Sequence, residues 1–447
     1  MPDALLTDLY ELNMAASYLR HDLRAEATFS CFVRQLPPDR GFLVAAGIED
    51  VCDYLEGYHF EPDDLAYLRA IGFPEDTLGQ LAALRFTGDV LAVPEGRLLL
   101  ANEPILEVTA PIAEAQLVET FVLNQISTQT MLASKAARCR IAAAGRIDLV
   151  EFGFRRTQGI EAGLAVARLA AMVGFAATSN VEAARRYGLN PSGTMAHSYI
   201  EAFEDESTAF ATFAGDFPGR TTFLVDTYDT LAGVARAIEV IRARGERHAG
   251  IRLDSGDLAA LAVASRRLLD EAGLEDTRIF VSGGLDEHDL ARFVALGAPI
   301  DAAGIGTRLG TSADAPYLDS AYKLVAYDGR PVAKLSTGKA TLPGPKQVFR
   351  GPGLDDEIAC RDEPIPDGRH PLLEPAVRQG RRVGPRQPLS VATGRFEGDL
   401  AQLPSRAHAL VAPEAPVASV SDRLGRLAAK VRGAALARVR PPAPAER

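Results

Sequence analysis

The sequence predicts an α/β protein in which a parallel β/α stretch is inserted into a domain made from both ends of the chain. Between Leu149 and Thr311, short apolar strands are each followed by polar or glycine-rich residues and usually by an amphipathic helix. Strands that alternate with helices in this way pair in parallel. On either side, residues 86–100 and 323–349 contain short apolar runs separated by turn residues, which is typical of antiparallel pairing.

We therefore expect four segments. Residues 1–125 form the first part of a mixed α/β domain, residues 126–315 form the β/α catalytic domain, residues 316–400 return to the mixed domain, and residues 401–447 form a C-terminal helical segment and tail.

The individual elements follow from local patterns. A helix is expected over Leu5–Leu19, which Thr7 or Asp8 can start, and a long helical stretch over Ala113–Arg140. Apolar runs bounded by polar residues predict strands at Leu149–Phe154, Thr222–Val225, Gly250–Leu253, Arg278–Val281 and Ile300–Ala303.

The C-terminal third has a different sequence pattern, without the regular alternation of strands and helices. Short strands are expected at Val332–Leu335 and Gln347–Phe349. Residues 351–388 are rich in proline, glycine and charge and should be mostly loop, whereas residues 419–438 have helical spacing. Residues 441–447 should be disordered.

Composition limits the function classes. The 447 residues carry a formal net charge of −11, so no nucleic-acid footprint is expected, although a local basic pocket for phosphates stays open. The four cysteines are scattered, which favours a reduced, cytoplasmic setting. No apolar run is long enough to span a membrane, and we expect no membrane partner.

Acidic residues stand at one predicted strand end. In Arg252-Leu253-Asp254-Ser255-Gly256-Asp257 the two carboxylates flank small residues that allow a ligand to approach. Ligands of parallel sheets bind at the carboxyl ends of the strands. Carboxylates there suit ribose hydroxyls or Mg²⁺. The alternative is that Asp257 caps the next helix, which explains one acid but not the pair beside Arg252.

Glycine loops follow the next two strands. Ser282-Gly283-Gly284 and Gly304-Ile305-Gly306-Thr307 place backbone N–H groups where phosphate oxygens can approach. Neither loop matches the P-loop or the dinucleotide fingerprint. Two such loops on successive strand ends indicate phosphate binding.

An aromatic residue and two arginines follow the first strand of the central stretch. Phe152 offers a face on which a flat heterocycle can stack, and Arg155 and Arg156 can hold a carboxylate or phosphate. The alternative is a core phenylalanine beside a solvated arginine pair.

One of the seven histidines, His197, lies in Gly193-Thr194-Met195-Ala196-His197-Ser198 after a Pro-Ser-Gly loop. A lone histidine is more often structural than catalytic. Near phosphates, however, a neutral imidazole acts as a base or as a phosphoryl acceptor.

These residues resemble the nicotinate phosphoribosyltransferase family over nearly the whole chain. Six ordered motifs carry the resemblance: Leu6-Thr7-Asp8-Leu9-Tyr10, Glu151-Phe152-Gly153-Phe154-Arg155-Arg156, Gly193-Thr194-Met195-Ala196-His197-Ser198, Arg252-Leu253-Asp254-Ser255-Gly256-Asp257, Gly304-Ile305-Gly306-Thr307 and Thr341-Leu342-Pro343-Gly344. The resemblance implies a type II phosphoribosyltransferase fold, in which an irregular, incomplete (β/α) barrel is inserted in the mixed domain.

The resemblance also implies a reaction. Nicotinate and phosphoribosyl pyrophosphate give nicotinate mononucleotide and pyrophosphate, with coupled hydrolysis of ATP and with Mg²⁺ as the metal. The histidine that ATP phosphorylates in the family matches His197.

The resemblance implies roles for further residues. Phe152 stacks on the pyridine ring, Arg155 and Arg252 lie near the base or the phosphates, and Asp254 binds ribose hydroxyls or the metal-bound substrate. The remaining positions expected to bind substrate are Thr194, Asp257, Gly283, Gly284, Gly306 and Thr307. In the family's head-to-tail homodimers, the tyrosine that matches Tyr10 completes the pocket of the other subunit. Gly284 is a departure, because some relatives carry an acidic or amide residue there.

The choice between nicotinate and nicotinamide depends on Ser179. Nicotinamide-using relatives place an aspartate at the corresponding point, and a neutral serine avoids repelling a carboxylate. The alternatives that stay open are a nicotinamide enzyme, a barrel enzyme acting on another sugar phosphate, and a non-catalytic nucleotide sensor.

Overall fold

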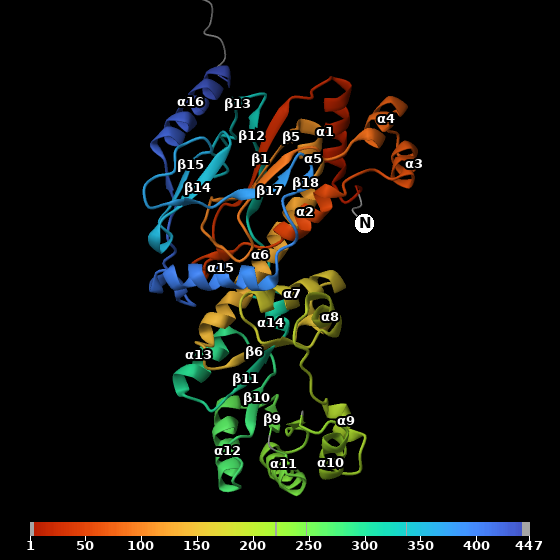
Figure 1. Cartoon of the computed structure of the whole chain (residues 1–447), viewed down its shortest axis with the longest axis vertical. Helices are drawn as coiled ribbons and strands as arrows, with labels where there is room; N and C mark the ends of the chain where they lie inside the picture. The colour runs from red at the N-terminus through yellow and green to blue at the C-terminus, as the bar shows by residue number, and fades with distance from the viewer. Residues whose placement is uncertain (1–3, 220, 247, 337, 440–447) are drawn as a thin grey trace, which may run out of the picture. The chain divides into compact units, whose positions relative to one another are not determined.

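The structure is a computed structural model that describes residues 4–219, 221–246, 248–336 and 338–439. It divides into two compact units (Figure 1). Unit 1 comprises residues 1–131 and 317–447, and unit 2 comprises residues 132–316. The division falls within the long helix α6 (Glu119–Ala142). None of the helices in the described ranges combines the length and the apolar character that crossing a bilayer requires.

Unit 1 is built on a seven-stranded antiparallel sheet with strand order β13-β12-β1-β5-β3-β17-β18. Strand β1 lies between β12 and β5, and its Phe29 is opposite Leu324 on one side and Val108 on the other. Because β1 comes early in the chain and β12 comes after residue 317, the sheet joins the two ends of the sequence. The strands are β1 (Glu26–Val33), β3 (Asp89–Ala92), β5 (Pro104–Pro111), β12 (Ser320–Tyr327), β13 (Arg330–Pro331), β17 (Glu374–Arg378) and β18 (Arg381–Arg382).

Two smaller sheets and a set of helices complete unit 1. One sheet has the order β16-β14-β15-β19 and the other pairs β2 with β4. Their strands are β2 (Leu43–Val44), β4 (Leu98–Leu99), β14 (Lys346–Arg350), β15 (Asp356–Cys360), β16 (His370–Pro371) and β19 (Ser419–Val420). The helices are α1 (Leu9–Arg20), α2 (Ile48–Glu56), α3 (Pro62–Ala70), α4 (Glu75–Ala83), α5 (Ile112–Leu117), α15 (Leu389–Gln402) and α16 (Asp422–Val439).

Unit 2 contains a six-stranded parallel sheet with the order β7-β6-β11-β10-β9-β8. The predicted parallel pairing of the central stretch is therefore confirmed. The strands are β6 (Asp148–Glu151), β7 (Ala177–Thr178), β8 (Thr222–Leu224), β9 (Gly250–Leu253), β10 (Arg278–Val281) and β11 (Ala302–Ile305). The helices are α7 (Ile160–Met172), α8 (Val181–Tyr187), α9 (His197–Glu201), α10 (Glu206–Asp216), α11 (Thr230–Arg244), α12 (Leu258–Glu271), α13 (Glu287–Leu296) and α14 (Thr307–Gly310).

Acidic and amide side chains begin most of the helices that follow the strands. The side chains of Asn180, Asp229, Asp257 and Asp286 each accept a hydrogen bond from a backbone N–H in the first turn of α8, α11, α12 and α13. Such caps satisfy N–H groups that have no partner inside the helix. Each cap fixes where the chain turns from a strand into a helix, and so fixes the loops at the carboxyl ends of the strands.

Four sequence-based expectations are wrong in detail. Residues 351–388 are not mostly loop, because β15, β16, β17 and β18 lie there. The charged residues of β15 made this segment look like a loop in the sequence. In the structure Asp356 is opposite Arg350 of β14, and the two side chains neutralise one another. Residues 332–335 form no strand, since the short strand β13 ends at Pro331, which has no N–H to donate.

The third difference concerns the 113–140 helical stretch, and the fourth concerns the last strand of the central stretch. The helical stretch is divided at Val118 into α5 and α6. The strand expected at residues 300–303 is β11, two residues later, where small residues pack between β10 and β6. The expected disorder of residues 441–447 lies outside the described residues.

Candidate active site

Polar side chains gather at the carboxyl ends of the parallel strands of unit 2. Asp226 follows β8, Asp254 follows β9 and Ser282 follows β10, and these three strands are neighbours in the sheet. Phe152 follows β6 and Gly306 follows β11, which are also neighbours. Since parallel strands end at the same edge of a sheet, the predicted residues meet along one edge.

Arg252 is the centre of the hydrogen-bond network at this edge. Its Nε donates to Ser282 Oγ at 2.7 Å, one Nη donates to Thr194 Oγ1 at 3.2 Å, and the other donates to Asp254 Oδ1 at 2.7 Å. The guanidinium is therefore held on three sides by residues from β9, β10 and the loop before α9. A fixed fork of N–H donors of this kind orients a carboxylate or phosphate more strictly than a lysine does.

The carboxylate of Asp254 is kept charged by its neighbours. Burial alone would raise the pKa of this group, but hydrogen bonding from Ser282 and the charge of Arg252 outweigh that effect, and the pKa of Asp254 lies below its ordinary value. The side chain is still 29% exposed, so a ligand can reach it. A charged, accessible carboxylate suits ribose hydroxyls or a water-bound Mg²⁺.

His197 is the first residue of α9 and lies beside this carboxylate. Its Nδ1 is 3.1 Å from Thr227 Oγ1, and its Nε2 is 4.0 Å from Asp254 Oδ2. The side chain is 43% exposed. The imidazole is therefore oriented by the Thr227 hydroxyl, lies near the Asp254 carboxylate and is open to a reactant, as a phosphoryl acceptor has to be.

Sequence reasoning missed Asp226 and Thr227 as site residues. One Asp226 oxygen, Oδ2, accepts hydrogen bonds from Ser255 Oγ at 2.6 Å and from the Asp254 N–H at 3.0 Å. Its other oxygen, Oδ1, is buried and has no hydrogen-bond partner within the described chain. The signal was present, because Val225-Asp226-Thr227 repeats the apolar-acid-hydroxyl pattern of Leu253-Asp254-Ser255 at the end of the preceding strand.

Phe152 lies on the other side of Arg252. Its ring centre is 5.7 Å from the Arg252 Cζ and 5.5 Å from the ring of Phe280. The ring also lies against Gly304, where a Cβ atom would be 2.6 Å from the ring. A glycine at position 304 therefore leaves room for the Phe152 ring, a reason that the sequence did not show.

The two glycines after β10 differ in their surroundings. Gly283 has φ +106°, and a Cβ there would lie 2.0 Å from the carbonyl oxygen of Asp254. Gly284 has φ +70° and open space around its Cα. Both backbone conformations favour glycine, but only Gly283 is also in close contact with the Asp254 segment.

The remaining predicted residues lie around this cluster. Arg155 and Ser179 are exposed at the ends of β6 and β7, and Gly306 and Thr307 lead from β11 into α14. Asp257 caps α12, which is the alternative that the sequence left open, and is 4.0 Å from Arg292. Tyr10 lies in unit 1, on α1, with 48% of its surface exposed.

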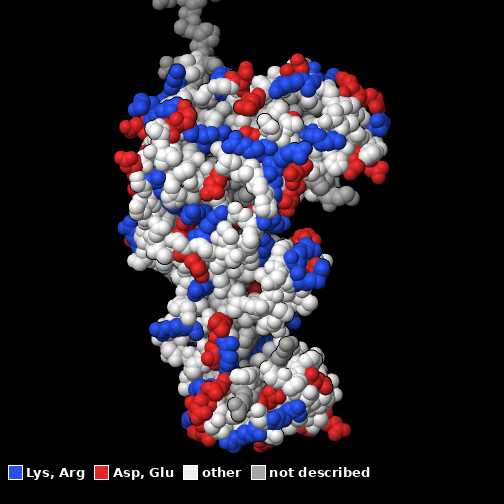
Figure 2. Space-filling model, in the orientation of Figure 1, with Lys and Arg blue, Asp and Glu red and all other residues white. Residues whose placement is uncertain are grey.

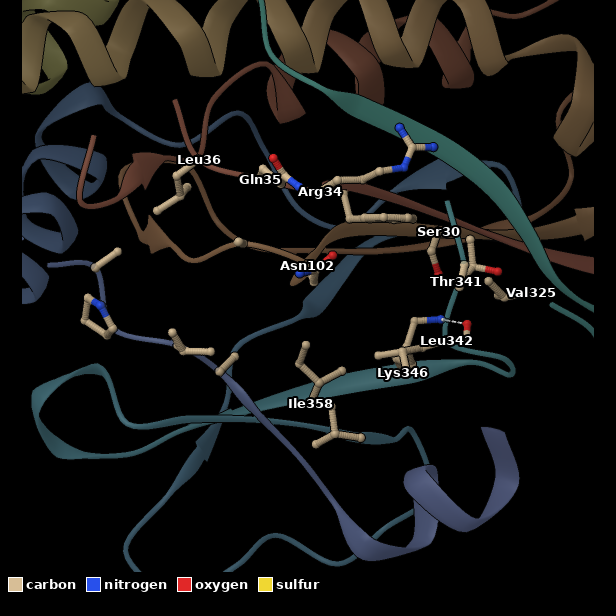
Figure 3. A pocket seen from close by; sticks show the side chains of 18 residues that line it. Ser30, Arg34, Gln35, Leu36, Asn102, Val325, Thr341, Leu342, Lys346 and Ile358 are labelled. Atoms are coloured by element: carbon tan, nitrogen blue, oxygen red, sulfur yellow. Dashed lines mark hydrogen bonds between the residues drawn. The ribbon is translucent and has the colours of Figure 1, made fainter. Parts of the chain in front are cut away.

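The Thr341-Leu342-Pro343-Gly344 motif also lies in unit 1. Thr341 and Leu342 line a pocket of about 510 Å³ together with side chains of β1, β14 and β15 (Figure 3). Lys346 donates to the carbonyl oxygens of Leu342 and Gly344, at 3.4 and 2.8 Å, and forms an ion pair with Glu107 at 3.0 Å. The motif therefore supplies carbonyl groups that hold a buried lysine.

Comparisons with known proteins match the two parts of the chain to one family. Residues 5–127 match the nicotinate phosphoribosyltransferase N-terminal domain, and residues 147–339 match the nicotinate phosphoribosyltransferase family. A nicotinate phosphoribosyltransferase of Mycobacterium tuberculosis is 47% identical over 98% of this chain and 96% of its own length. One from Bacillus subtilis is 44% identical over 81% of this chain and 77% of its own length.

Solved structures share the fold. The human nicotinic acid phosphoribosyltransferase superposes with a TM-score of 0.84 at 28% identity, covering 95% of this chain and 99% of the human chain. A nicotinate-nucleotide pyrophosphorylase from Pyrococcus furiosus superposes with a TM-score of 0.75 at 25% identity, covering 89% and 95% of the two chains.

Proposed function

Since the chain belongs to the nicotinate phosphoribosyltransferase family, we propose that it transfers the 5-phosphoribosyl group from phosphoribosyl pyrophosphate to nicotinate. The C1–oxygen bond to pyrophosphate breaks, a bond forms between C1 and the ring nitrogen of nicotinate, and pyrophosphate leaves. This reaction belongs to NAD biosynthesis.

The observation that carries the proposal is the Arg252 network beside His197. Breaking the C1–oxygen bond develops positive charge on the ribose and negative charge on the leaving group. Asp254, kept charged by Ser282 and Arg252, lies where it can bind ribose hydroxyls, and Arg252 can bind a phosphate or a carboxylate. The ring nitrogen of nicotinate is already unprotonated, so the protein needs only to position it.

The residues present also suit Mg²⁺. Asp254 and the unpartnered Oδ1 of Asp226 offer two carboxylates at adjacent strand ends. Mg²⁺ takes few protein oxygens and completes its shell with water and substrate phosphates, which fits so small a donor set. When bound, the ion stabilises negative charge on pyrophosphate.

Coupling to ATP is assigned to His197. In this proposal the imidazole nitrogen takes the γ-phosphoryl group of ATP, ADP leaves, and water later hydrolyses the phosphohistidine. The hydroxyl of Thr227 orients Nδ1, and the exposed side chain leaves room for the nucleotide.

Recognition of the base is assigned to Phe152, Ser179 and Arg155. The ring of Phe152 would stack on pyridine, Arg155 would attract the carboxylate, and Ser179 would add no charge to repel it. The runner-up substrate is nicotinamide, which lacks the negative charge that Arg155 would bind.

We further propose an architecture and assembly. The six parallel strands of unit 2 form the wall of an incomplete barrel inserted in the mixed domain. The protein is a cytoplasmic homodimer in which Tyr10, half exposed on α1, completes the partner's site.

One experiment tests the substrate and the role of His197 together. The purified protein is incubated with Mg²⁺, phosphoribosyl pyrophosphate and either nicotinate or nicotinamide, with and without ATP, and the mononucleotide is measured. We expect product from nicotinate, increased by ATP in the wild type but not in His197→Ala. Product mainly from nicotinamide would overturn the assignment of Ser179, and no product from either base would contradict the transferase assignment.

A further inference from the structure

A second pocket, of about 710 Å³, lies in unit 1 beside helix α16. Its walls are α16, the end of β15 and the turns around β13 and β14. Its lining residues are Gly329, Pro331, Gly344, Pro345, Cys360, Arg361, Asp362, Arg423, Arg426, Leu427 and Lys430. Four of these residues are cations and one is an acid, in a chain whose formal net charge is −11. On the face of unit 1 that Figure 2 shows, basic side chains gather in a band that begins near α16.

The four cations are not all neutralised. Arg423 forms an ion pair with Asp362 at 2.6 Å, and Arg361 forms one with the buried Glu107 at 2.7 Å. Arg426 and Lys430 are exposed and form no ion pair within the described residues. These two residues are four positions apart on α16 and therefore project from the same side of the helix.

Arg361 lines the pocket from another part of the chain and has one donor that solvent does not reach. The Nε of Arg361 is buried and has no hydrogen-bond partner within the described chain. Arg361 follows β15, whereas Arg423, Arg426 and Lys430 lie on α16, so the cations reach the pocket from two separate parts of the chain.

Another part of the wall is formed by Gly344 and Pro345, in a turn to which the proposed reaction in unit 2 gives no role, and the Pro345 carbonyl oxygen accepts a hydrogen bond from the Arg361 N–H at 3.0 Å. Gly344 has φ +79°, and a Cβ there would be 3.3 Å from the Leu427 side chain and 4.0 Å from Pro331. The turn therefore packs directly on α16 and sets the depth of the pocket.

We propose that this pocket binds a small polyphosphate, meaning a chain of two or more phosphate groups, whether inorganic or carried by a nucleotide. Arginine forks and a lysine are the side chains that bind phosphate oxygens most strongly. The lining contains no aromatic residue, so the pocket offers no face on which a nucleobase can stack. The phosphate chain is thus the recognised part of the ligand. This proposal is independent of the function proposed for unit 2.

The test uses the full chain and inorganic tripolyphosphate without divalent metal. Hydrogen exchange followed by mass spectrometry reports which segments the probe protects, and calorimetry reports the affinity. The variant is Arg426→Glu with Lys430→Glu. The control is Arg432→Glu, which makes half of this charge change at an exposed position of α16 that does not line the pocket.

We expect tripolyphosphate to protect residues 360–363 and 422–430 in the wild type and in the control. In the double variant this protection should disappear, and binding at this site should weaken about tenfold or more, a difference of about 1.4 kcal/mol per factor of ten. High salt should weaken binding in the wild type, because the cations are exposed. ATP should protect residues 422–430 no more strongly than tripolyphosphate does at the same concentration; stronger protection of this segment by ATP would contradict recognition by phosphate alone.

The result that would overturn the proposal is protection confined to the glycine loops at residues 282–284 and 304–307, or equal protection of 422–430 in the double variant. Those loops lie in unit 2, so their response reports on the proposed active site separately. The absence of polyphosphate binding beside α16 can therefore be distinguished from the absence of binding at the proposed active site.

Discussion

Two arginine–aspartate clusters in this molecule use the same side chains in different surroundings. In unit 2, Arg252 contacts Asp254 at 2.7 Å, with 14% and 29% of these side chains exposed. In unit 1, Arg350 contacts Asp356 at 2.6 Å and Asp399 at 2.7 Å, with no more than 2% of any of the three side chains exposed.

The difference lies in what remains available to a ligand. Arg350 also donates to the carbonyl oxygen of Leu98, and Asp399 accepts from Arg97 and the Leu98 N–H, so the buried cluster is internally satisfied. Burial and the nearby Asp356 raise the pKa of Glu103 well above its ordinary value, which keeps a further charge out of that cluster. The buried cluster of Arg350, Asp356 and Asp399 can only join strands and helices. The cluster of Arg252 and Asp254, which we call the open cluster, can exchange its contacts for contacts with substrate.

The largest expected effect comes from breaking the buried cluster. Arg350→Met should lower the free energy of unfolding by about 3–5 kcal/mol, because Asp356 and Asp399 keep their charge without the cation that balances it. Urea unfolding of the full chain, followed by circular dichroism, measures the change.

The matched substitution in the other cluster is Arg252→Met. It should lower the free energy of unfolding by less, since water can reach Asp254, while it removes most of the transferase activity. If both variants unfold at the same urea concentration, burial does not separate the two clusters as we argue.

A second prediction compares two acids of one loop. Asp254→Asn should reduce kcat/KM for phosphoribosyl pyrophosphate about 100-fold, or about 2.7 kcal/mol, because the ribose and metal ligand loses its charge. Asp257→Asn should have little effect, since Asp257 caps α12 and asparagine caps a helix as well as aspartate does. Steady-state kinetics at saturating nicotinate measure both. Equal losses would assign Asp257 a direct role.

A third prediction concerns the two glycines that follow β10. Gly283→Ala should weaken binding of phosphoribosyl pyrophosphate about tenfold or more, because its Cβ would collide with the carbonyl oxygen of Asp254 and move that segment. Gly284→Ala meets no neighbouring atom and should show only the cost of its left-handed backbone, about 1–2 kcal/mol of stability. Calorimetric titration with phosphoribosyl pyrophosphate measures the affinity of both variants. If the two affinities are equal, the collision of a Cβ at position 283 with Asp254 does not weaken binding.

The open cluster was easier to predict from the sequence than the buried one. Asp254, Ser282 and His197 follow strands or loops, where a polar residue between apolar runs is conspicuous. Thr227 and Asp226 were missed because their importance depends on two strands being neighbours, and a single sequence does not show strand order. Asp257, which was expected to bind substrate, caps α12 in the structure, and the sequence could not separate the two roles because a cap and a ligand have the same sequence signature.

The buried cluster was not predicted at all. Its members Arg350, Asp356 and Asp399 lie up to 49 positions apart, in segments that look charged and loop-like. The neutralisation of Asp356 by Arg350 makes β15 a buried strand despite its composition. The alternation of strands and helices in unit 2 was predictable, because it depends on local periodicity and capping residues.

The smallest expected effect concerns the proton of Asp254. Burial opposes the charged form of this carboxyl, but Ser282 and Arg252 favour it, so its folded pKa lies below the ordinary value of about 3.9. A carboxyl of this kind contributes stability above its unfolded pKa and loses that contribution as the pH falls through the folded pKa. Activity that needs charged Asp254 is lost over the same pH range.

Ser282→Ala removes one hydrogen bond to the charged form and leaves the burial unchanged. The pKa of Asp254 should therefore rise, and the acidic limb of the kcat/KM profile should move to higher pH. The control is Ser255→Ala, because Ser255 donates to Asp226 and not to Asp254, and its acidic limb should stay in place. Circular dichroism at each pH separates this shift from acid unfolding. If the acidic limb of the kcat/KM profile does not move in Ser282→Ala, Arg252 alone keeps Asp254 charged. The two clusters would then differ in burial, but in both of them an arginine alone would stabilise the charged aspartate.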